Sequence, residues 1–314
     1  MCHRPLQGTR GSARIAHAGG WAQDKWRVSR FSSLPGQRAP FVPVTSTSLG
    51  GGVNWLLLHL PTAVLGLLTV GAVVALSAGG LFLVRRNVEL QTLESHNAVA
   101  GFIIAVVGVV YAVLLGFVVV VVWQEYADAR AAADDEATLV ASLFENAAAF
   151  SEPQRGELDQ RLETYARSVI TEEWAAMARQ RERVSTELAF HDLWQGFRTA
   201  TPHSRVEQIF YDQSIQQMEQ LTEARQDRLL ASHAKVPGVM WTVLLMGGLI
   251  TVGFTYFFGV SNFRAQLMMV LVLATTVGLV LFLILAMNYP FTGGLSIRPS
   301  AMQEVLEDLR FIAM

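Results

Sequence analysis

The stretch Ala98–Trp123 reads AVAGFIIAVVGVVYAVLLGFVVVVVW, and its 26 residues include no Asp, Glu, Lys or Arg. A helix needs about 20 apolar residues to cross the hydrocarbon core of a bilayer. Three more uncharged runs in the chain are also long enough: Trp55–Val84, Val236–Val260 and Leu267–Met287. Runs of this length indicate four transmembrane helices rather than buried core helices of a soluble protein.

The four runs come as two hairpins and divide the 314 residues into five segments. No segment alternates with the period of two that strands require, so we predict an all-α membrane protein with a cytoplasmic helical bundle between the second and third membrane helices. The predicted segments are a tail at 1–52, a first transmembrane hairpin at 53–123 (spans 55–84 and 98–123), the helical bundle at 124–235, a second hairpin at 236–288 (spans 236–260 and 267–287), and a tail at 289–314.

Charge is scarce and unevenly placed. Only 16% of residues are charged and the net charge is −2, so no global field would recruit nucleic acid. Of the 24 basic residues, 21 lie in the middle segment and the two tails, and three lie in the hairpin loops. The positive-inside rule therefore puts the middle segment and both termini in the cytoplasm. Only two of the basic residues are lysine, a bias typical of a GC-rich bacterial genome, so we expect a bacterial inner membrane protein.

The two tails differ in character. Residues 1–52 are rich in Gly, Ser, Arg and Pro, which leaves two interpretations: a disordered cationic tail, or a mis-annotated gene start with translation beginning near Val53. Residues 289–314 predict a short amphipathic helix starting at Ser300. Its apolar face would contain Met302, Val305, Leu306 and Leu309.

Catalytic and cofactor motifs are absent from the sequence. It contains no phosphate-binding GK[ST] loop, no HExxH pattern and a single cysteine, Cys2. Glu187 and His191 are four residues apart and could share a metal, but a solvated pair is the simpler interpretation. We therefore expect neither an enzyme nor a metal or other cofactor. Since the four runs hold no charged residue, coupled transport is also disfavoured, which leaves passive conduction, signalling or a structural role.

The second run carries two ordered faces at helical spacing. The first, which we call the small stripe, consists of Gly101, Ala105, Gly108 and Ala112. Small residues permit close helix approach, so we expect this stripe to pack against the protomer's own helices. The second, the bulky seam, consists of Ile103, Val107, Val110, Leu114, Phe117 and Val121. It is the candidate pore lining around an axis shared by several copies. Alternatively, the bulky seam faces lipid or the core of the bundle.

The third run has small and hydroxyl residues at steps of four, namely Gly247, Thr251, Thr255 and Gly259. This pattern again predicts close packing, with the threonine hydroxyls bonded to the helix backbone or to a neighbour.

Several of these stretches together resemble the bestrophin-like family of uncharacterised bacterial integral membrane proteins. The matching stretches are His96–Phe102, Val107–Phe117, Glu172–Trp174, Arg225–Leu229, Gly253–Gly259 and Pro290–Gly293. The residues taken as the family signature are His96, Asn97, Tyr111, Trp123, Arg264, Pro290 and Phe291. The resemblance runs from about Trp55 to the C-terminus and does not include the first tail.

The family is similar in architecture to true bestrophins, pentameric anion channels whose second membrane helix forms the pore neck. The resemblance implies a homo-oligomer in membrane lipid that passes small inorganic anions. This chain lacks a phenylalanine-rich neck, has Asn288 where an aspartate is expected, and shows no acidic motif for calcium. The function hypothesis is therefore a passive ion channel, most simply for anions. The alternative is a non-conducting signalling or scaffold protein whose cytoplasmic bundle binds a partner.

Overall fold

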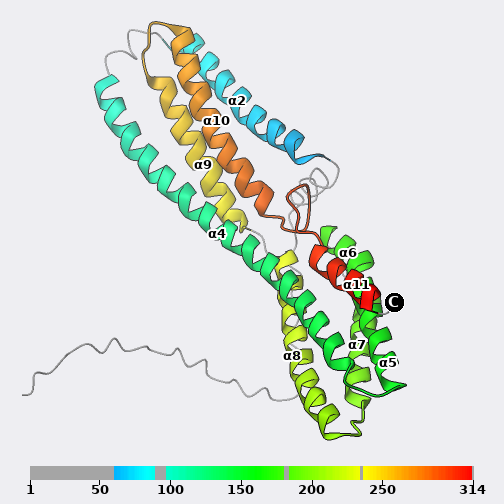
Figure 1. Ribbon diagram of the computed structural model, residues 1–314. Helices are drawn as coiled ribbons and strands as arrows, with labels where there is room; N and C mark the ends of the chain where they lie inside the picture. The colour runs from blue at the N-terminus through cyan, green and yellow to red at the C-terminus, as the bar shows by residue number, and fades with distance from the viewer. Residues whose placement is uncertain (1–59, 89–96, 180–183, 234–235, 313–314) are drawn as a thin grey trace, which may run out of the picture. The chain divides into compact units, whose positions relative to one another are not determined.

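The computed structural model describes residues 60–88, 97–179, 184–233 and 236–312, and all regular secondary structure in these ranges is helical (Figure 1). Four described helices are long and apolar enough to cross a membrane, which confirms the number expected from the sequence. They are α2 (Thr62–Asn87), α4 (Asn97–Ala147), α9 (Gly238–Phe254) and α10 (Phe263–Met287). The interpretations of residues 1–52 fall outside the described residues.

Local sequence sets where three of these helices begin. Pro61 and Pro237 are the N-cap residues of α2 and α9, both with extended ψ angles, because proline suits the start of a helix but not its interior. The Asn262 side chain caps α10 by accepting hydrogen bonds from the backbone N–H groups of Arg264 and Ala265. Helix α9 is followed directly by η2, a 3₁₀ turn at Thr255–Phe257.

The packing of the four apolar helices differs from two simple hairpins. Helix α2 packs mainly against α10, where Gly278 allows close approach: a Cβ there would lie 3.3 Å from the Cα of Val70. Helix α4 packs against α9 and α10 instead. The first predicted hairpin, α2 with α4, is therefore not a closely packed pair, and α10 joins the two.

Helix α4 continues without a break past Trp123, the end of the uncharged run, to Ala147. Its extension packs antiparallel against α8 (Arg205–His233). Glu136 pairs with Arg228 and, further along α4, Asn146 donates a 2.8 Å hydrogen bond to Gln217, which lies earlier in α8. A capping interaction starts α8, because the Ser204 hydroxyl accepts a hydrogen bond from the Glu207 N–H.

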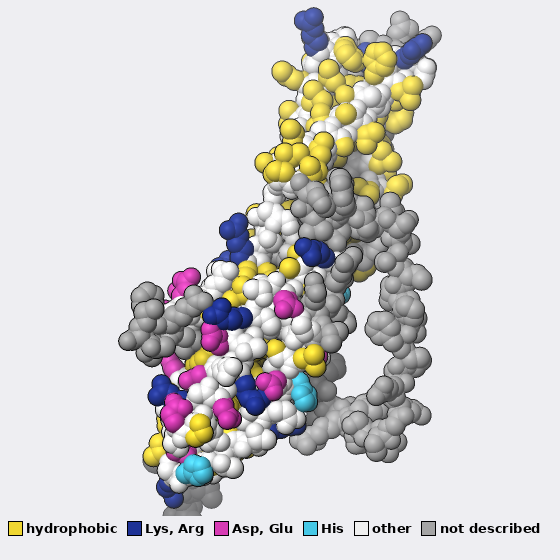
Figure 2. Space-filling view, turned by 90° about the vertical axis from the view of Figure 1, so that its right-hand side faces the viewer, with side chains coloured by type: hydrophobic (Ala, Val, Ile, Leu, Met, Phe, Trp, Pro, Cys, Tyr) yellow, Lys and Arg dark blue, Asp and Glu magenta, His cyan; other side chains and the backbone are white. Residues whose placement is uncertain are grey.

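The remaining helices pack against this α4–α8 pair and share an apolar core with it. They are α5 (Gln154–Ser168), the π-helical turn η1 (Val169–Glu173), α6 (Trp174–Ala178), α7 (Val184–Thr199) and α11 (Ser300–Ile312). Helix α11 packs on α4 and buries Met302 and Leu306 in this core. On the face shown in Figure 2, hydrophobic side chains cover the apolar helices, and the Asp and Glu side chains gather over the charged helical region.

Candidate functional site

Within its apolar run, helix α4 packs against its own protomer mainly through one face. The buried residues of this face are Ala100, Tyr111, Leu115, Val118 and Val122. Tyr111 fixes the contact with α9, because its hydroxyl donates a 2.9 Å hydrogen bond to the carbonyl oxygen of Leu244. Most of the remaining surface of the apolar run is exposed in the protomer.

The bulky seam lies along one flank of this buried face. Val107 and Leu114 are half-buried, next to the protomer's own helices. The other four members of the seam, Ile103, Val110, Phe117 and Val121, are exposed. A helix at the centre of an assembly would present its pore-lining side chains on the side opposite the buried face. The bulky seam does not lie on that side.

The small stripe lies along the other flank and was wrongly expected to pack against the protomer's own helices. Ala105 and Ala112 are exposed, and a Cβ added to Gly108 would meet nothing within 4 Å in the described part of the chain. Gly101 has a single distant neighbour, the ring of Phe258 at 3.9 Å from an added Cβ. The close packing of α4 is provided instead by the large side chains around Tyr111.

On the partner helix α9, small residues do make room for α4. A Cβ added to Gly247 would lie 2.6 Å from the ring of Tyr111. Thr251 is buried and its hydroxyl donates to the Gly247 carbonyl, whereas the half-buried Thr255 donates to the Val252 carbonyl. Gly259, after the 3₁₀ turn, is also buried.

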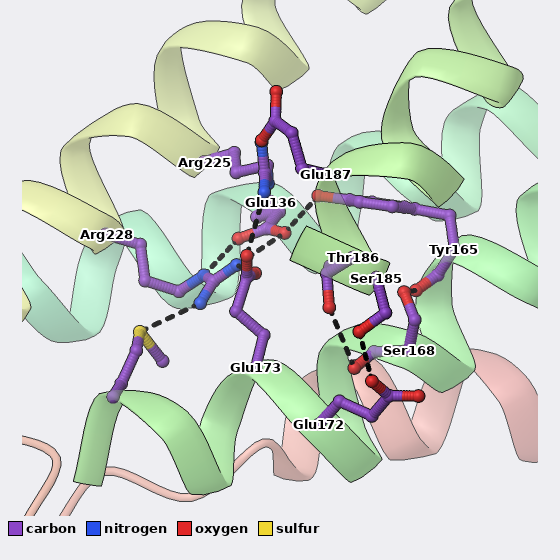
Figure 3. Close-up of polar contacts among 11 residues, drawn as sticks. Glu136, Tyr165, Ser168, Glu172, Glu173, Ser185, Thr186, Glu187, Arg225 and Arg228 are labelled. Atoms are coloured by element: carbon purple, nitrogen blue, oxygen red, sulfur yellow. Dashed lines mark hydrogen bonds and ion pairs between the residues drawn. The ribbon is translucent and has the colours of Figure 1, made fainter. Parts of the chain in front are cut away.

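Outside the apolar run, α4 carries a buried charged group that the sequence analysis did not single out. Glu136 and Arg228 are both completely buried, and Arg228 donates to both carboxylate oxygens of Glu136 (Figure 3). Arg228 also donates to Glu173 at the end of the π-helical turn and, at 3.0 Å, to the sulfur of Met177. The Tyr165 hydroxyl donates a 2.6 Å hydrogen bond to Glu136.

A second arginine extends this group towards the surface. Arg225 donates 2.8 Å hydrogen bonds to Glu173 and to Glu187, whose side chain is 64% exposed. Its Nε is buried and has no hydrogen-bond acceptor among the described residues, and its guanidinium lies 4.8 Å from the centre of the Phe190 ring. We call Glu136, Tyr165, Glu173, Arg225 and Arg228 the ionic cluster.

The ionic cluster holds two carboxylates and two guanidinium groups, so its formal charges balance. Burial by itself lowers the pKa of Arg228, but the charge and hydrogen bonds of Glu136 and the charge of Glu173 together raise it above its usual value. Burial and then the charge of Glu136 raise the pKa of the Tyr165 hydroxyl well above 10.0. At neutral pH the arginines are therefore cationic and the tyrosine is protonated, as the observed hydrogen bonds require.

Two of the signature stretches meet beside this cluster. The Trp174 indole donates a 3.0 Å hydrogen bond to the Ile297 carbonyl, and its ring meets Phe291 edge-on with centroids 5.7 Å apart. The Pro290 carbonyl accepts a 2.7 Å hydrogen bond from Ile297, which closes the turn after α10. These contacts anchor the segment after α10 to α6, next to Glu173.

The other signature residues are dispersed. Trp123 is exposed at the end of the apolar run of α4, and Arg264 is exposed in the first turn of α10. His96 lies outside the described residues, as does the side chain of Asn97, which begins α4. Asn288 accepts a 2.7 Å hydrogen bond from the Val236 N–H. The side-chain oxygen of an aspartate could accept the same hydrogen bond. Asn288, which stands where an aspartate is expected, therefore keeps the acceptor for the Val236 N–H.

Glu187 and His191, four residues apart in the sequence, both belong to α7. Glu187 is bonded to Arg225, and no group of three or more potential metal ligands occurs within the described ranges. Most polar atoms of the ionic cluster are hydrogen-bonded within it, and these contacts join α4, α5, α8 and the π-helical turn.

A sequence model of the Bestrophin-like domain matches residues 71–302. A crystal structure of a bacterial bestrophin homologue from Klebsiella pneumoniae, with a mutation, is similar in fold with a TM-score of 0.57 at 14% sequence identity, covering 77% of this chain and 99% of that chain. No curated protein matches the chain. The match over most of the sequence shows that the chain belongs to the Bestrophin-like family.

Proposed function

We propose that the protein is an oligomeric, passive ion channel of the inner membrane that conducts small inorganic anions, with α4 next to the symmetry axis. The observation that carries the proposal is the exposure of α4. It is the longest of the four membrane-capable helices, and within its apolar run it packs against its own protomer mainly through one face. The remaining apolar surface is available to other copies and to a central lumen.

Two further observations support passive conduction. The uncharged runs contain no Asp, Glu, Lys or Arg, the residues that pumps and coupled transporters commonly use to bind protons or ions, and their one histidine, His59, lies near the start of the first run. The fold is also similar to that of a bacterial bestrophin homologue over nearly all of that chain. A lumen lined by apolar side chains such as those of α4 can gate by dewetting, without a charged filter.

The orientation belongs to the same proposal. The helical region formed by the extension of α4, by α5 to α8 and by α11 would lie in the cytoplasm, because most basic residues are on that side. Proteolysis of sealed inside-out vesicles should then cut this region, and proteolysis of intact spheroplasts should leave it whole. The opposite pattern would overturn the orientation.

Conduction is tested with purified protein in planar bilayers under a chloride gradient. We expect currents whose reversal potential follows the chloride gradient and shifts when a larger anion replaces chloride. Reproducible absence of current with correctly folded protein would contradict the channel and favour the non-conducting scaffold.

A matched pair of cysteine variants tests whether α4 lines the conducting path. In a Cys2→Ser background, Val113→Cys lies on the exposed side of α4 and Leu76→Cys on the exposed side of α2. A membrane-impermeant thiol reagent should reduce the current of Val113→Cys, because thiolates react where water is present. It should leave Leu76→Cys unchanged. If the reagent changed the current of neither variant, Val113 would face lipid and not the conducting path.

A further inference from the structure

A groove lies on the surface of the apolar helices between α2 and α10. It encloses about 380 Å³, which is within the range of small-molecule sites in proteins. The argument depends on six of its lining residues: Thr62, Ala63, Gly66 and Val70 of α2, with Leu279 and Phe282 of α10. Thr62 is the only one of the described lining residues that has a polar side chain. The groove therefore suits an apolar ligand with a polar end.

Small residues on α2 give the groove its depth. Ala63 and Gly66 leave space on this side, and a Cβ added to Gly66 would lie 3.1 Å from the Phe282 ring of α10. Thr62 and Val70 are eight residues apart, so the groove extends about 12 Å along α2. One leaflet supplies about half of the roughly 30 Å hydrocarbon core, so this length covers most of one leaflet.

The Thr62 end of the groove lies where the apolar helices meet the charged helical region. The turn after α10 covers this end, because a Cβ added to Gly294 would lie 1.9 Å from the Thr62 Oγ1. The next residue of the turn, Leu295, accepts a 2.8 Å hydrogen bond from the hydroxyl of Tyr126, which follows the uncharged run of α4. Thr62 is therefore level with the membrane interface, where the polar parts of lipids lie.

The Thr62 hydroxyl is available for a ligand. Its oxygen is buried and has no hydrogen-bond partner among the described residues. A hollow of about 10 Å³ lies beside Thr62, under the turn after α10, and this is about the space that one water molecule needs. The first turn of α2 also contains no acidic residue and no side-chain cap. Together with the positive end of the helix dipole, these features favour an oxygen-bearing, anionic group at this end.

The groove faces away from α4. Helix α10 lies between α2 and α4, and α2 packs mainly against α10 (Figure 1). If α4 adjoins the symmetry axis, α2 is therefore at the outside of the assembly. Leu67, Leu68 and Leu279 beside the groove are each more than half exposed. An apolar surface of this kind at the outside of a membrane protein is covered by lipid.

We propose that this groove binds one phospholipid of the leaflet next to the charged helical region. One acyl chain lies between α2 and α10, and an ester or phosphate oxygen accepts a hydrogen bond from the Thr62 hydroxyl. The outward position of α2 rests on the proposed function, whereas the groove and the unpaired hydroxyl belong to the protomer itself. Such a lipid is held at a fixed site, unlike lipids that exchange freely around an apolar surface.

Native mass spectrometry of the full-length protein in detergent tests the site, with phosphatidylglycerol added to delipidated protein as the probe. Ala63→Phe fills the groove from an exposed position, and Ala72→Phe places the same ring on an exposed part of α2 outside the groove. The wild type and Ala72→Phe should bind one phosphatidylglycerol per protomer before any further lipid. Ala63→Phe should bind it about tenfold more weakly or not at all, because the ring takes the space of the chain. Equal affinities of the two phenylalanine variants would overturn the proposal.

The polar contact is tested at Thr62 without filling the groove. Thr62→Val replaces the hydroxyl with a methyl group of similar size and should weaken binding by about two- to tenfold, the effect of losing one hydrogen bond. Thr62→Ser keeps the hydroxyl and should bind like the wild type. If Thr62→Val bound as tightly as Thr62→Ser, the hydroxyl would not contact the lipid and the proposed contact would be wrong.

Other occupants of the groove give different results, and each overturns the proposal. If a neighbouring copy filled the groove, Ala63→Phe would lower the oligomer fraction in the same spectra and leave lipid binding unchanged. If a part of this chain before Leu60 filled it, the delipidated wild type would bind phosphatidylglycerol no more tightly than Ala63→Phe does.

Failure of this site is distinguishable from failure of the channel, because lipid binding is measured without conduction. Protein that binds the lipid through Thr62 but passes no current would retain the site and contradict the channel. Currents from wild-type protein that shows no preferred phosphatidylglycerol would retain the channel and reject the site.

Discussion

Arg228 of α8 donates hydrogen bonds to both carboxylate oxygens of Glu136 of α4, and neither side chain has any surface exposed to solvent. The two residues are 92 positions apart in the chain. Glu136 lies on the same helix face as Tyr111, so one continuous helix is held at two points. The Tyr111 contact fixes it to α9 and the ionic cluster fixes it to α8.

Removing Arg228 should strongly destabilise the protein. Arg228→Met leaves Glu136 without a cation, because Arg225 bonds to Glu173 and Glu187 instead. An uncompensated buried charge costs about 3–5 kcal/mol. The double change Glu136→Gln with Arg228→Met restores charge balance in the cluster, so it should cost clearly less than the sum of the single changes. A double-mutant cycle measured by chemical denaturation in detergent gives the coupling energy.

Arg155→Met is the control, because Arg155 and its partner Asp159 are both partly exposed and 3.7 Å apart. This change should cost less than about 1 kcal/mol. Additive effects of Glu136→Gln and Arg228→Met would show that the observed pair does not contribute to stability as a unit.

The raised pKa of Tyr165 predicts that the folded protein loses stability at alkaline pH. Burial and the charge of Glu136 raise its pKa in the folded protein above the usual value of 10.0. A group with a raised folded pKa contributes its full stability below its unfolded pKa and loses it as the pH rises above that value. The free energy of unfolding should therefore fall above about pH 10, where the unfolded tyrosine ionises.

Tyr165→Phe should remove part of this alkaline loss, because the phenyl ring cannot ionise. The variant is expected to be less stable than the wild type at pH 8, where the hydrogen bond to Glu136 is lost, and the difference should narrow above pH 10. Denaturation curves collected across this pH range measure both effects. Parallel pH profiles for the two proteins would contradict the assigned environment of Tyr165.

The parts of the fold that were predictable are those written in local sequence. Length and absence of charge identify four membrane helices, and Pro61 and Pro237 mark where two of them begin. The arrangement of the helices was harder to predict from the sequence. Helix α2 packs on α10, although the short loop after α2 suggested a pairing with α4. Such choices depend on which faces fit, and uncharged helices have similar apolar residues on every face.

The ionic cluster was missed for a related reason. Glu136 stands in the sequence Asp134-Asp135-Glu136, where three acidic residues suggest a solvated surface. Only Glu136 continues the spacing of Leu115, Val122 and Ala129 along the buried face, and that period was the available signal. Its partners come from distant helices, so their meeting could not be derived from spacing. The small stripe was misassigned because the size of its residues alone does not show which face of α4 packs against the protomer's own helices.

Gly247 should tolerate no side chain. A Cβ at this position would lie 2.6 Å from the Tyr111 ring, which is held by the hydrogen bond to Leu244. Gly247→Ala should therefore destabilise the protein by about 1–3 kcal/mol through overpacking, less the gain of up to about 1 kcal/mol from replacing a helical glycine. The loss should shrink when Tyr111→Leu removes the ring.

Gly253→Ala is the matched control on the same helix, since an added Cβ there meets nothing within 4 Å in the described structure. It should leave the melting temperature in detergent unchanged or raise it. If both alanine variants melt at the same temperature, the close contact between α4 and α9 is not present in the folded protein.

Arg85 at the end of α2 should be more important for stability than its neighbour Arg86. Arg85 donates a 2.7 Å hydrogen bond from Nε to Gln266, donates from Nη2 to the Val260 carbonyl, and lies 5.8 Å from the centre of the Phe263 ring. It thereby ties α2 to the first turn of α10 and to the segment before it, whereas the Arg86 side chain is exposed. Hydrogen bonds from a charged donor are worth about 1.5–3 kcal/mol each.

Arg85→Gln should therefore lower the melting temperature measurably, and Arg86→Gln should change it little. Arg85→Lys keeps the charge but cannot reach both acceptors in the same geometry, so it should fall between the wild type and Arg85→Gln. These three variants separate a structural role of Arg85 from a role in setting the orientation. If Arg85→Gln left stability intact but changed the protease sensitivity of sealed vesicles, its charge would direct topology instead of joining the helices.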